Sequence, residues 1–152
     1  MYVAVDDTDS LKGNCTTFLA TEIISELSDL DLIGNPRLVR LNPAVPWKTR
    51  GNGAIVMEFG KGDGRKKKIG EIDGKEVFSS PCGKMPASME ILERLIPLVE
   101  KHTSKDAQPG LLLGDRKPSA RFYQMGCTTI VDREEVDGEI HRIGAFHRSW
   151  NG

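Results

Sequence analysis

Short apolar runs separated by polar segments organise this chain of 152 residues. The first run, Tyr2 to Val5, ends abruptly in carboxylates, which predicts a buried strand whose carboxyl end meets solvent. A polar loop over residues 6–13 follows it. Apolar residues at helical spacing then predict a helix over 16–30, namely Leu19, Ile23, Ile24, Leu27 and Leu30. The chain is therefore expected to open as a strand, an acidic loop and a helix.

The later apolar runs predict further strands, at 36–42, 54–59 and 109–114. A hairpin of two strands is predicted over 69–72 and 75–78, because Asp73-Gly74 between them suits a type I′ turn. Helical spacing predicts a long helix over 86–102 with a kink at Pro97, and short helices over 119–126 and 133–136. Segments rich in breakers or basic residues predict loops, at 43–53 and 61–68.

These elements do not alternate regularly between strand and helix, so an all-parallel sheet is not expected. The predicted fold class is α/β (α+β), with a mixed β-sheet, a few helices packed on it and a single domain. The composition agrees, because 38 % of the residues are hydrophobic, and no apolar run approaches the roughly 20 residues that a membrane span needs. The first residues show no signal-peptide pattern, so a cytoplasmic protein with no membrane partner is expected. Cys15, Cys82 and Cys127 have no spacing typical of a zinc site or a disulfide framework.

Charge is distributed unevenly although the formal net charge is only -1. Residues 1–31 carry seven acidic side chains and one basic one, whereas residues 32–68 carry nine basic and two acidic ones. This pattern fits an acidic edge that binds a metal beside a surface that binds anions. It fits equally well two solvated faces that attract each other, and the charge counts leave both interpretations open.

The densest group of candidate site residues is Asp6, Asp7 and Asp9, directly after the first strand. Three carboxylates so close together repel one another unless a cation neutralises them, and hard oxygen ligands suit Mg²⁺. Ligand sites in α/β sheets also gather at the carboxyl ends of strands. We therefore expect a metal site here. The alternative is a solvated turn in which an aspartate caps the next helix.

A glycine-containing segment, Gly13 to Thr17, leads into the predicted helix. The free N–H groups and positive dipole end of a helix start suit phosphate, and Lys12 adds a charge. We expect Lys12, Gly13 and Thr17 to bind phosphate, and a hydroxyl at this place could ligate Mg²⁺ or accept a phosphoryl group. The segment is not a Walker A loop. Ordinary capping by Asn14, Thr16 or Thr17 is the alternative.

Basic residues flank the breaker-rich loop between two predicted strands. Arg37 and Arg40 precede it, and Lys48, Arg50 and Asn52 lie within it. Such a set could clamp nucleotide phosphates or an RNA backbone, or could belong to a solvated loop. Few aromatic residues lie among these bases, so a stacking platform for single-stranded nucleic acid is weakly supported.

Two long motifs occur in order. One is Asp6-Asp7-Thr8-Asp9-Ser10 followed by Gly13-x-Cys15-Thr16-Thr17, and the other runs from Arg37 to Ala54 and contains Pro46-Trp47-Lys48-Thr49-Arg50-Gly51-Asn52-Gly53. Together they resemble the N-terminal part of the archaeal tRNA agmatidine synthases, the 2-agmatinylcytidine synthetases. The resemblance is dense over residues 1–57 and thin beyond. It departs from the family at Ala4, where glycine is usual, and at Asn14, where methionine is usual.

This resemblance implies a kinase-like domain that uses ATP and Mg²⁺. In the family, the wobble cytidine of an isoleucine tRNA with a CAU anticodon is activated by phosphorylation, and agmatine then displaces the activated oxygen. The matched positions imply Asp6, Asp7 and Asp9 as Mg²⁺ ligands, with Asp7 and Asp9 also catalytic. They imply Thr16 as a threonine that the domain phosphorylates. Lys48, Arg50 and Asn52 would bind nucleotide phosphates, and Arg37 and Arg40 are expected to contact RNA.

Family chains are much longer, so residues 1–152 are expected to form the N-terminal kinase-like ATP-binding domain of a longer enzyme. A second hypothesis is a non-catalytic RNA- or nucleotide-binding relative that lacks the other domains. A third, a phosphatase of the haloacid dehalogenase type, needs D-x-D-x-[TV], but Leu11 stands at the last position of that motif. The oligomeric state is left open by the sequence.

Overall fold

Strand β1 (Tyr2–Asp6) is an interior strand of the sheet, in a computed structural model that describes residues 1–49 and 51–150. It pairs antiparallel with β4 (Gly53–Asp63) on one side and with β8 (Gly110–Gly114) on the other. Val3 lies opposite Met57 of β4 and Leu113 of β8. The Met1 ammonium donates to the Phe59 carbonyl at 2.7 Å and to the Met85 carbonyl at 2.8 Å, which anchors the start of β1.

The described strands form one mixed sheet in the order β5-β6-β2-β4-β1-β8-β9, with β3 and β7 paired to β4 off this path. The remaining strands are β2 (Asp31–Ile33), β3 (Arg37–Arg40), β5 (Lys67–Ile72), β6 (Lys75–Ser80), β7 (Cys82–Lys84) and β9 (Phe146–Ser149). Of the pairings between described strands, only β2 with β6 is parallel. The predicted fold class, a mixed sheet with helices in a single α+β domain, is confirmed.

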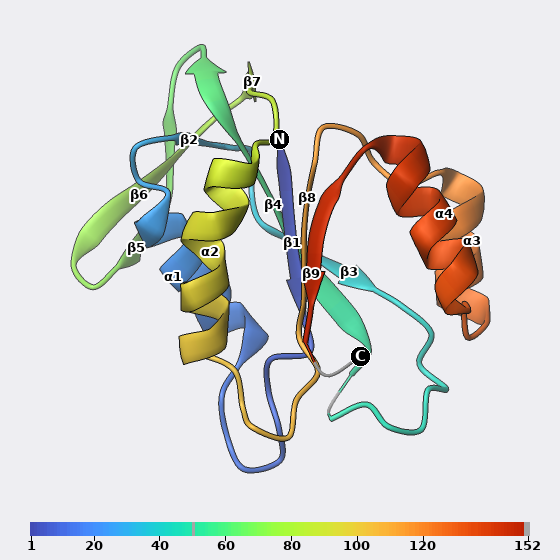
Figure 1. The fold of residues 1–152 in the computed structure, drawn as a ribbon. Helices are drawn as coiled ribbons and strands as arrows, with labels where there is room; N and C mark the ends of the chain where they lie inside the picture. Colours follow the sequence, from blue (N-terminus) through green and yellow to red (C-terminus); the bar gives the residue numbers. More distant parts are fainter. Residues whose placement is uncertain (50, 151–152) are drawn as a thin grey trace.

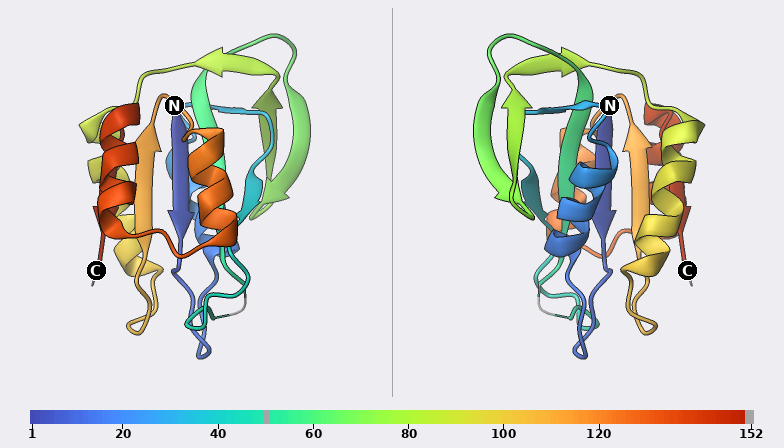
Figure 2. Two further views of the ribbon diagram at one scale, coloured as in Figure 1. Left: turned by 90° about the vertical axis from the view of Figure 1, so that its right-hand side faces the viewer. Right: turned by 90° about the vertical axis from the view of Figure 1, so that its left-hand side faces the viewer.

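Helices cover both faces of the sheet (Figures 1 and 2). Helices α1 (Thr16–Glu26) and α2 (Met89–Lys101) pack together on one face, and α3 (Ala120–Thr128) and α4 (Arg133–Ile143) lie over the other (Figure 2). The core lies under α1 and α2, where these side chains are buried: Val3, Val5, Leu19, Ile23, Leu27, Met57, Phe59, Leu95, Val99, Leu111 and Leu113. In contrast, α3 has no buried residue and α4 has only Ile143.

Several predicted boundaries were wrong. The helix over 16–30 ends at Glu26, because Leu27 leaves the helical conformation and the chain then turns into β2. The predicted loop over 61–68 is largely strand, since β4 continues to Asp63, where it pairs with β7. Helix α2 begins at Met89 rather than at residue 86, and α4 extends to Ile143. The short strands β2, β7 and β9 were not predicted, because three or four residues are too few to show a periodicity.

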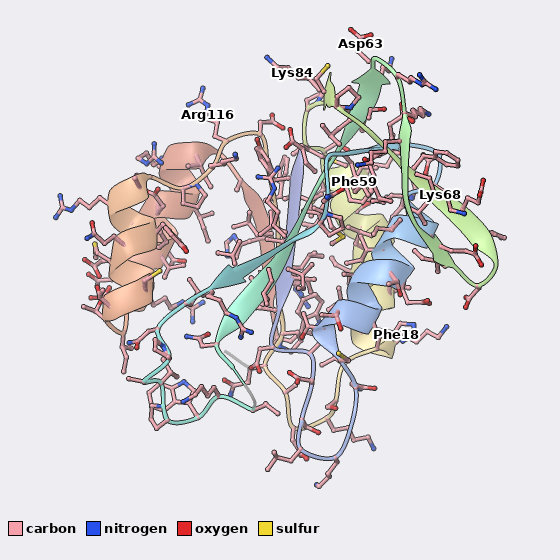
Figure 3. The ribbon with its side chains drawn as sticks, turned by 180° about the vertical axis from the view of Figure 1, so that it is seen from behind. Phe18, Phe59, Asp63, Lys68, Lys84 and Arg116 are labelled. Carbon is pink, nitrogen blue, oxygen red and sulfur yellow. The ribbon has the colours of Figure 1, made fainter. Side chains whose placement is uncertain are left out.

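The carboxyl end of β1, the start of α1 and the loop that follows β3 all lie at one end of the molecule (Figure 1). At the opposite end, Asp63 of β4 and Lys84 of β7 project outward (Figure 3). Within the described residues, no helix is long and apolar enough to cross a bilayer.

Candidate active site

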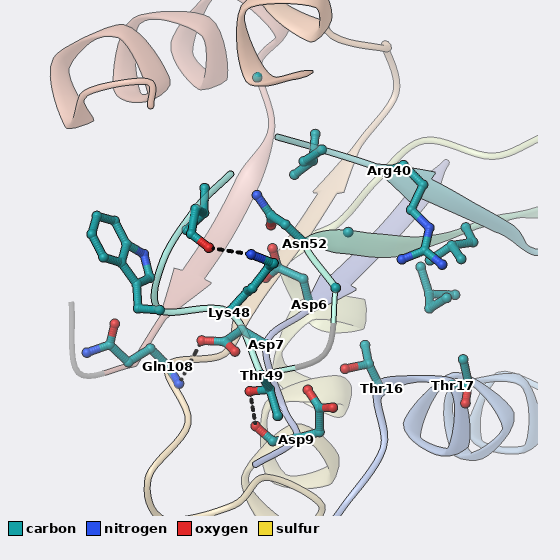
Figure 4. A pocket seen from close by; sticks show the side chains of 18 of the residues that line it. Asp6, Asp7, Asp9, Thr16, Thr17, Arg40, Lys48, Thr49, Asn52 and Gln108 are labelled. Carbon is teal, nitrogen blue, oxygen red and sulfur yellow. Dashed lines mark hydrogen bonds between the residues drawn. The ribbon is translucent and has the colours of Figure 1, made fainter. Parts of the chain in front are cut away.

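A cavity of about 520 Å³ opens where β1 ends. The start of α1, the loop after β3 and the connection between α3 and α4 form its other walls (Figure 4). Eight of the site residues predicted from the sequence line it, namely Asp6, Asp7, Asp9, Thr16, Thr17, Arg40, Lys48 and Asn52. The structure thus brings together the acidic motif and part of the basic motif, which are more than thirty residues apart in the chain.

Asp6 is the last residue of β1 and lies opposite Gly110 of β8. Burial, and secondly the nearby charge of Asp7, raise the pKa of the Asp6 carboxyl to about 6, although a hydrogen bond from the Gly110 amide opposes the rise. A Cβ at position 110 would stand 2.9 Å from Asp6 Oδ1, so the close approach of this carboxylate requires glycine. A carboxylate held in this way gains from a cation in the cavity.

Asp7 turns the chain out of the strand with a φ of 46°, in the left-handed region that asparagine and aspartate tolerate best among non-glycine residues. Its Oδ2 accepts a hydrogen bond from the Gln108 amide at 3.2 Å. Burial raises the pKa of the Asp7 carboxyl; the Gln108 amide opposes this rise, and the charge of Asp9 adds to it. This hydrogen bond holds the Asp7 carboxylate in the lining of the cavity, to which Asp6 also belongs.

Among residues 1–49 and 51–150, no three His, Cys, Asp or Glu side chains are grouped tightly enough to hold a metal ion by themselves. Mg²⁺ keeps several waters and is commonly held by one or two carboxylates together with substrate phosphates. A magnesium site here would therefore use one or two of Asp6, Asp7 and Asp9, with phosphate oxygens and waters as its other ligands. The three carboxylates do not form a closed cage such as a structural Zn²⁺ or Ca²⁺ site requires.

The N-cap of α1 is Cys15, whose side chain makes no capping hydrogen bond. The N-cap is therefore none of the three residues that the sequence offered for it, Asn14, Thr16 and Thr17. Thr16 and Thr17 are the first two helical residues and line the cavity. The first backbone N–H groups of the helix, at its positive end, lie beside these residues, which is a favourable arrangement for an anion.

The basic side of the cavity is held by hydrogen bonds within the loop after β3. Lys48 Nζ donates to the Val45 carbonyl at 2.8 Å, and Asn52 Nδ2 donates to the Asn42 carbonyl at 3.1 Å. Thr49 Oγ1 donates to the Asp9 carbonyl at 3.4 Å, which joins this loop to the acidic segment. Arg50 lies outside the described residues, so its predicted role has no structural counterpart.

Three predicted site residues do not line the cavity. Gly13 and Lys12 belong to a tight turn that Ser10 and Gly13 close with two backbone hydrogen bonds, and Lys12 Nζ contacts Asp106 Oδ2 at 2.9 Å. Arg37 lies on β3, where its guanidinium is 3.5 Å from Glu58 Oε2. These three residues therefore lie outside the lining of the cavity.

Some residues at the site were not found from the sequence. Thr8 is fully buried and donates to Thr16 Oγ1 at 3.1 Å, and Gln108 anchors Asp7 through its backbone amide. The apolar part of the cavity wall includes Leu38, Ile130 and Trp47, the last of which is 72 % exposed. A tryptophan directly after a proline in a breaker-rich loop was the available signal for this wall. Gln108 gave no signal, because its backbone makes the contact.

A family model described as the TiaS TCKD domain matches residues 2–152, almost the whole chain and every described residue of the cavity. The chain belongs to the TiaS TCKD domain family. Curated relatives named TiaS, the 2-agmatinylcytidine synthetase of an isoleucine tRNA, include those of Archaeoglobus fulgidus, 53 % identical over 149 residues, and Thermoplasma volcanium, 38 % identical over 143 residues. The chain covers 96 % and 92 % of its own length in these matches but only 30 % and 32 % of the relatives.

Solved structures agree with the TCKD assignment. The structure described as a complex of TiaS with its isoleucine tRNA and ATP is 26 % identical, with a TM-score of 0.73, and the match covers 99 % of this chain and 33 % of that one. A second structure, described as TiaS with the same tRNA, AMPCPP and agmatine, is 24 % identical with a TM-score of 0.68, which supports the fold alone. This TCKD chain thus spans about a third of the length of the proteins that it resembles.

Proposed function

We propose that this TCKD domain binds ATP and Mg²⁺ and carries out phosphoryl transfer within a cytoplasmic tRNA-modifying enzyme. One observation carries the proposal: Asp6, Asp7 and Asp9 line the same cavity as Thr16 at the start of α1. Phosphoryl transfer requires charge neutralisation and positioning more than covalent chemistry by the protein. A carboxylate cluster, a helix N-terminus and the cations Lys48 and Arg40 supply both.

One or two of the carboxylates of Asp6, Asp7 and Asp9 would hold Mg²⁺, which supplies positive charge beside the phosphates when bound. Thr16 Oγ1 attacks the γ-phosphorus of ATP; the new Oγ1–P bond forms as the bond from that phosphorus to the bridging oxygen breaks. ADP leaves with the electron pair, and the Thr16 proton passes to Asp7 or Asp9. Lys48, Asn52 and the helix N–H groups hold the remaining phosphate oxygens, and the apolar wall with Trp47 faces the base.

The wider activity follows from the relatives. The relatives are 2-agmatinylcytidine synthetases of an isoleucine tRNA, and solved TiaS complexes contain that tRNA with ATP or with AMPCPP and agmatine. We infer the same partners for the enzyme to which this domain belongs. Phosphorylation makes the cytidine carbonyl oxygen a phosphate leaving group, which the agmatine amine displaces. Arg40, at the cavity, and Arg37, on the same strand, are the candidates for RNA contact from this domain.

Tryptophan fluorescence can measure nucleotide binding and so test the proposal, because the chain has only two tryptophans and Trp47 lines the cavity. In a Trp150→Phe variant the fluorescence reports on Trp47 at the cavity wall. A nonhydrolysable ATP analogue should change this fluorescence in a manner that depends on Mg²⁺. Asp7→Ala should abolish the Mg²⁺ dependence, whereas Asp137→Ala on the exposed face of α4 should leave it intact.

Two results would count against the proposal. Equal analogue binding with and without Mg²⁺ in the parent variant would remove the metal assignment. Salt-sensitive tRNA binding with no response to the ATP analogue would favour the non-catalytic RNA-binding hypothesis instead.

A further inference from the structure

Thr8 stands out among the buried polar residues, because it lies inside the acidic motif yet is fully withdrawn from solvent. Its neighbours Asp7 and Asp9 line the cavity, but its own side chain points inward and donates a hydrogen bond from Oγ1 to Thr16 Oγ1 at 3.1 Å. Thr16 is the first residue of α1, so this hydrogen bond joins the end of β1 to the start of the helix. Thr8, which has no role in the proposed function so far, is thus hydrogen-bonded to Thr16, the proposed phosphate acceptor.

Ser104, in the loop after α2, forms hydrogen bonds with the backbone near both Thr8 and Thr16. The Ser104 amide donates to the Thr8 carbonyl at 3.0 Å, and the Ser104 hydroxyl donates to the Gly13 carbonyl at 3.2 Å. Asn14 Nδ2 in turn donates to Ser104 Oγ at 3.2 Å. The backbone on either side of the Thr8–Thr16 hydrogen bond is therefore tied to one loop, which keeps the two hydroxyls at a fixed separation.

The hydrogen bond from Thr8 limits which lone pair of Thr16 Oγ1 can react. A threonine hydroxyl has one proton and two acceptor lone pairs. Thr8 occupies one lone pair of Thr16 Oγ1 from the buried side, so the other lone pair and the proton are left to the cavity side. That is the arrangement a nucleophile needs, with one lone pair free for phosphorus and the proton free for a carboxylate. Thr8 is also β-branched, which restricts its χ1 rotation and makes it a stiff donor.

We propose that Thr8 is a positioning residue for Thr16: its buried hydroxyl orients the Thr16 oxygen for attack on phosphorus. The inference rests on the proposed phosphoryl transfer to Thr16. Thr8 itself touches neither ATP nor metal, so its removal should slow the transfer step and leave ATP binding unchanged. A misplacement of a reacting atom by an ångström costs on the order of 10²-fold in rate.

The test compares the initial rate of phosphate incorporation at Thr16 in four proteins: wild type, Thr8→Val, Thr8→Ser and Thr21→Val. Valine keeps the shape and removes the donor, whereas serine restores the donor. Thr21 is the matched control, because its hydroxyl lies on α1 but donates to the Phe18 carbonyl away from the cavity. Melting temperature and affinity for an ATP analogue, from Trp47 fluorescence, are measured on each.

The expected result is a loss of about 10²-fold in the maximal rate for Thr8→Val, with analogue affinity unchanged. Thr8→Ser should recover most of the rate, and Thr21→Val should equal wild type. A wild-type rate in Thr8→Val would overturn the inference alone, as would a parallel loss of analogue binding and of melting temperature. If wild type itself never gains phosphate on Thr16, the proposed function fails and the inference fails with it.

Discussion

At the scale of one residue, the ionised Asp6 carboxylate at the site lowers the free energy of unfolding. Its carboxyl pKa is raised from the ordinary 3.8 to about 6 in the folded chain, chiefly by burial. A raised pKa means that ionisation favours the unfolded chain, so the resulting penalty is absent below about pH 4 and complete above about pH 6. This penalty is what a bound cation would relieve.

We therefore predict that Asp6→Asn stabilises the metal-free protein at pH 8, by on the order of 2–3 kcal/mol in the free energy of unfolding. The gain should shrink towards zero at pH 4, where the wild-type carboxyl is protonated in the folded chain. Urea unfolding in the presence of EDTA measures both values. Mg²⁺ with an ATP analogue should raise the melting temperature of wild type but not of Asp6→Asn. A variant that is less stable than wild type at pH 8 would show that burial does not strain this carboxylate.

At residue scale, the sequence predicts a shared location most directly where the residues are close in the chain. Asp6, Asp7, Asp9 and Thr16 are close in the chain, and the structure places all four at one cavity. Lys12 is close to these residues in sequence, but it lies on the tight turn between Ser10 and Gly13 and does not line the cavity. Thr8 escaped notice because its role depends on which way a side chain points, which a motif of consecutive polar residues does not reveal.

Helix α2 is the clearest case at the scale of the element. It carries Pro97 inside its span, yet it is continuous from Met89 to Lys101. Its apolar stripe explains this, since Ile91, Leu92, Leu95 and Val99 are all buried against α1 and the sheet. Burial of each such side chain contributes roughly 1.5–3 kcal/mol to the free energy of folding. Together they outweigh the loss of the one helical hydrogen bond that proline cannot donate.

Pro97 is exposed, so its replacement removes no core contact. We predict that Pro97→Ala raises the free energy of unfolding by about 1–2 kcal/mol, because the missing amide hydrogen bond is restored; the gain is reduced by the greater freedom of the unfolded chain. Thermal or urea unfolding gives the value, with the exposed Glu93→Ala on the same helix as the matched control. A decrease in stability for Pro97→Ala would show that the helix depends on the proline ring.

Element boundaries were predicted well where turn residues mark them and poorly where apolar spacing alone was the guide. The hairpin of β5 and β6 around Asp73-Gly74 appears as expected, with both turn residues at positive φ. Helix α1 was predicted four residues too long, because Leu27 and Leu30 continue its apolar spacing and nothing in the chain marks Glu26 as its end. The pairing of β2 with Phe59 and Gly60 of β4 draws the chain out of the helix.

At the scale of the whole molecule, the basic residues of the charge pattern fall into two groups. Lys66 contacts Asp31, which is an attraction between the acidic and basic stretches at the surface. Arg40 and Lys48 instead line the same cavity as the aspartates, which is the arrangement that the anion-binding interpretation requires. The sequence could not divide the cations between these uses, because the division follows from the path of β3 and β4.

This division makes a prediction about RNA. Arg40 is exposed at the cavity, whereas Arg37 lies 3.5 Å from Glu58 and is partly neutralised. We expect Arg40→Gln to weaken tRNA binding and to lower the slope of log affinity against log salt by about 1, and Arg37→Gln to change it less. Filter binding across a salt series measures both slopes, and equal slopes for wild type and Arg40→Gln would exclude that arginine from the RNA contact.

The location of phosphate after incubation with ATP and Mg²⁺ tests the central claim most directly, by mass spectrometry of the peptide that contains residues 14–17. The account predicts one phosphate on Thr16. It should be absent in Thr16→Val and in Asp7→Ala, with Thr21→Val labelled as in wild type. An unmodified Thr16 in wild type, or Mg²⁺-dependent ATP turnover that persists unchanged in Thr16→Val, would contradict phosphoryl transfer to this residue.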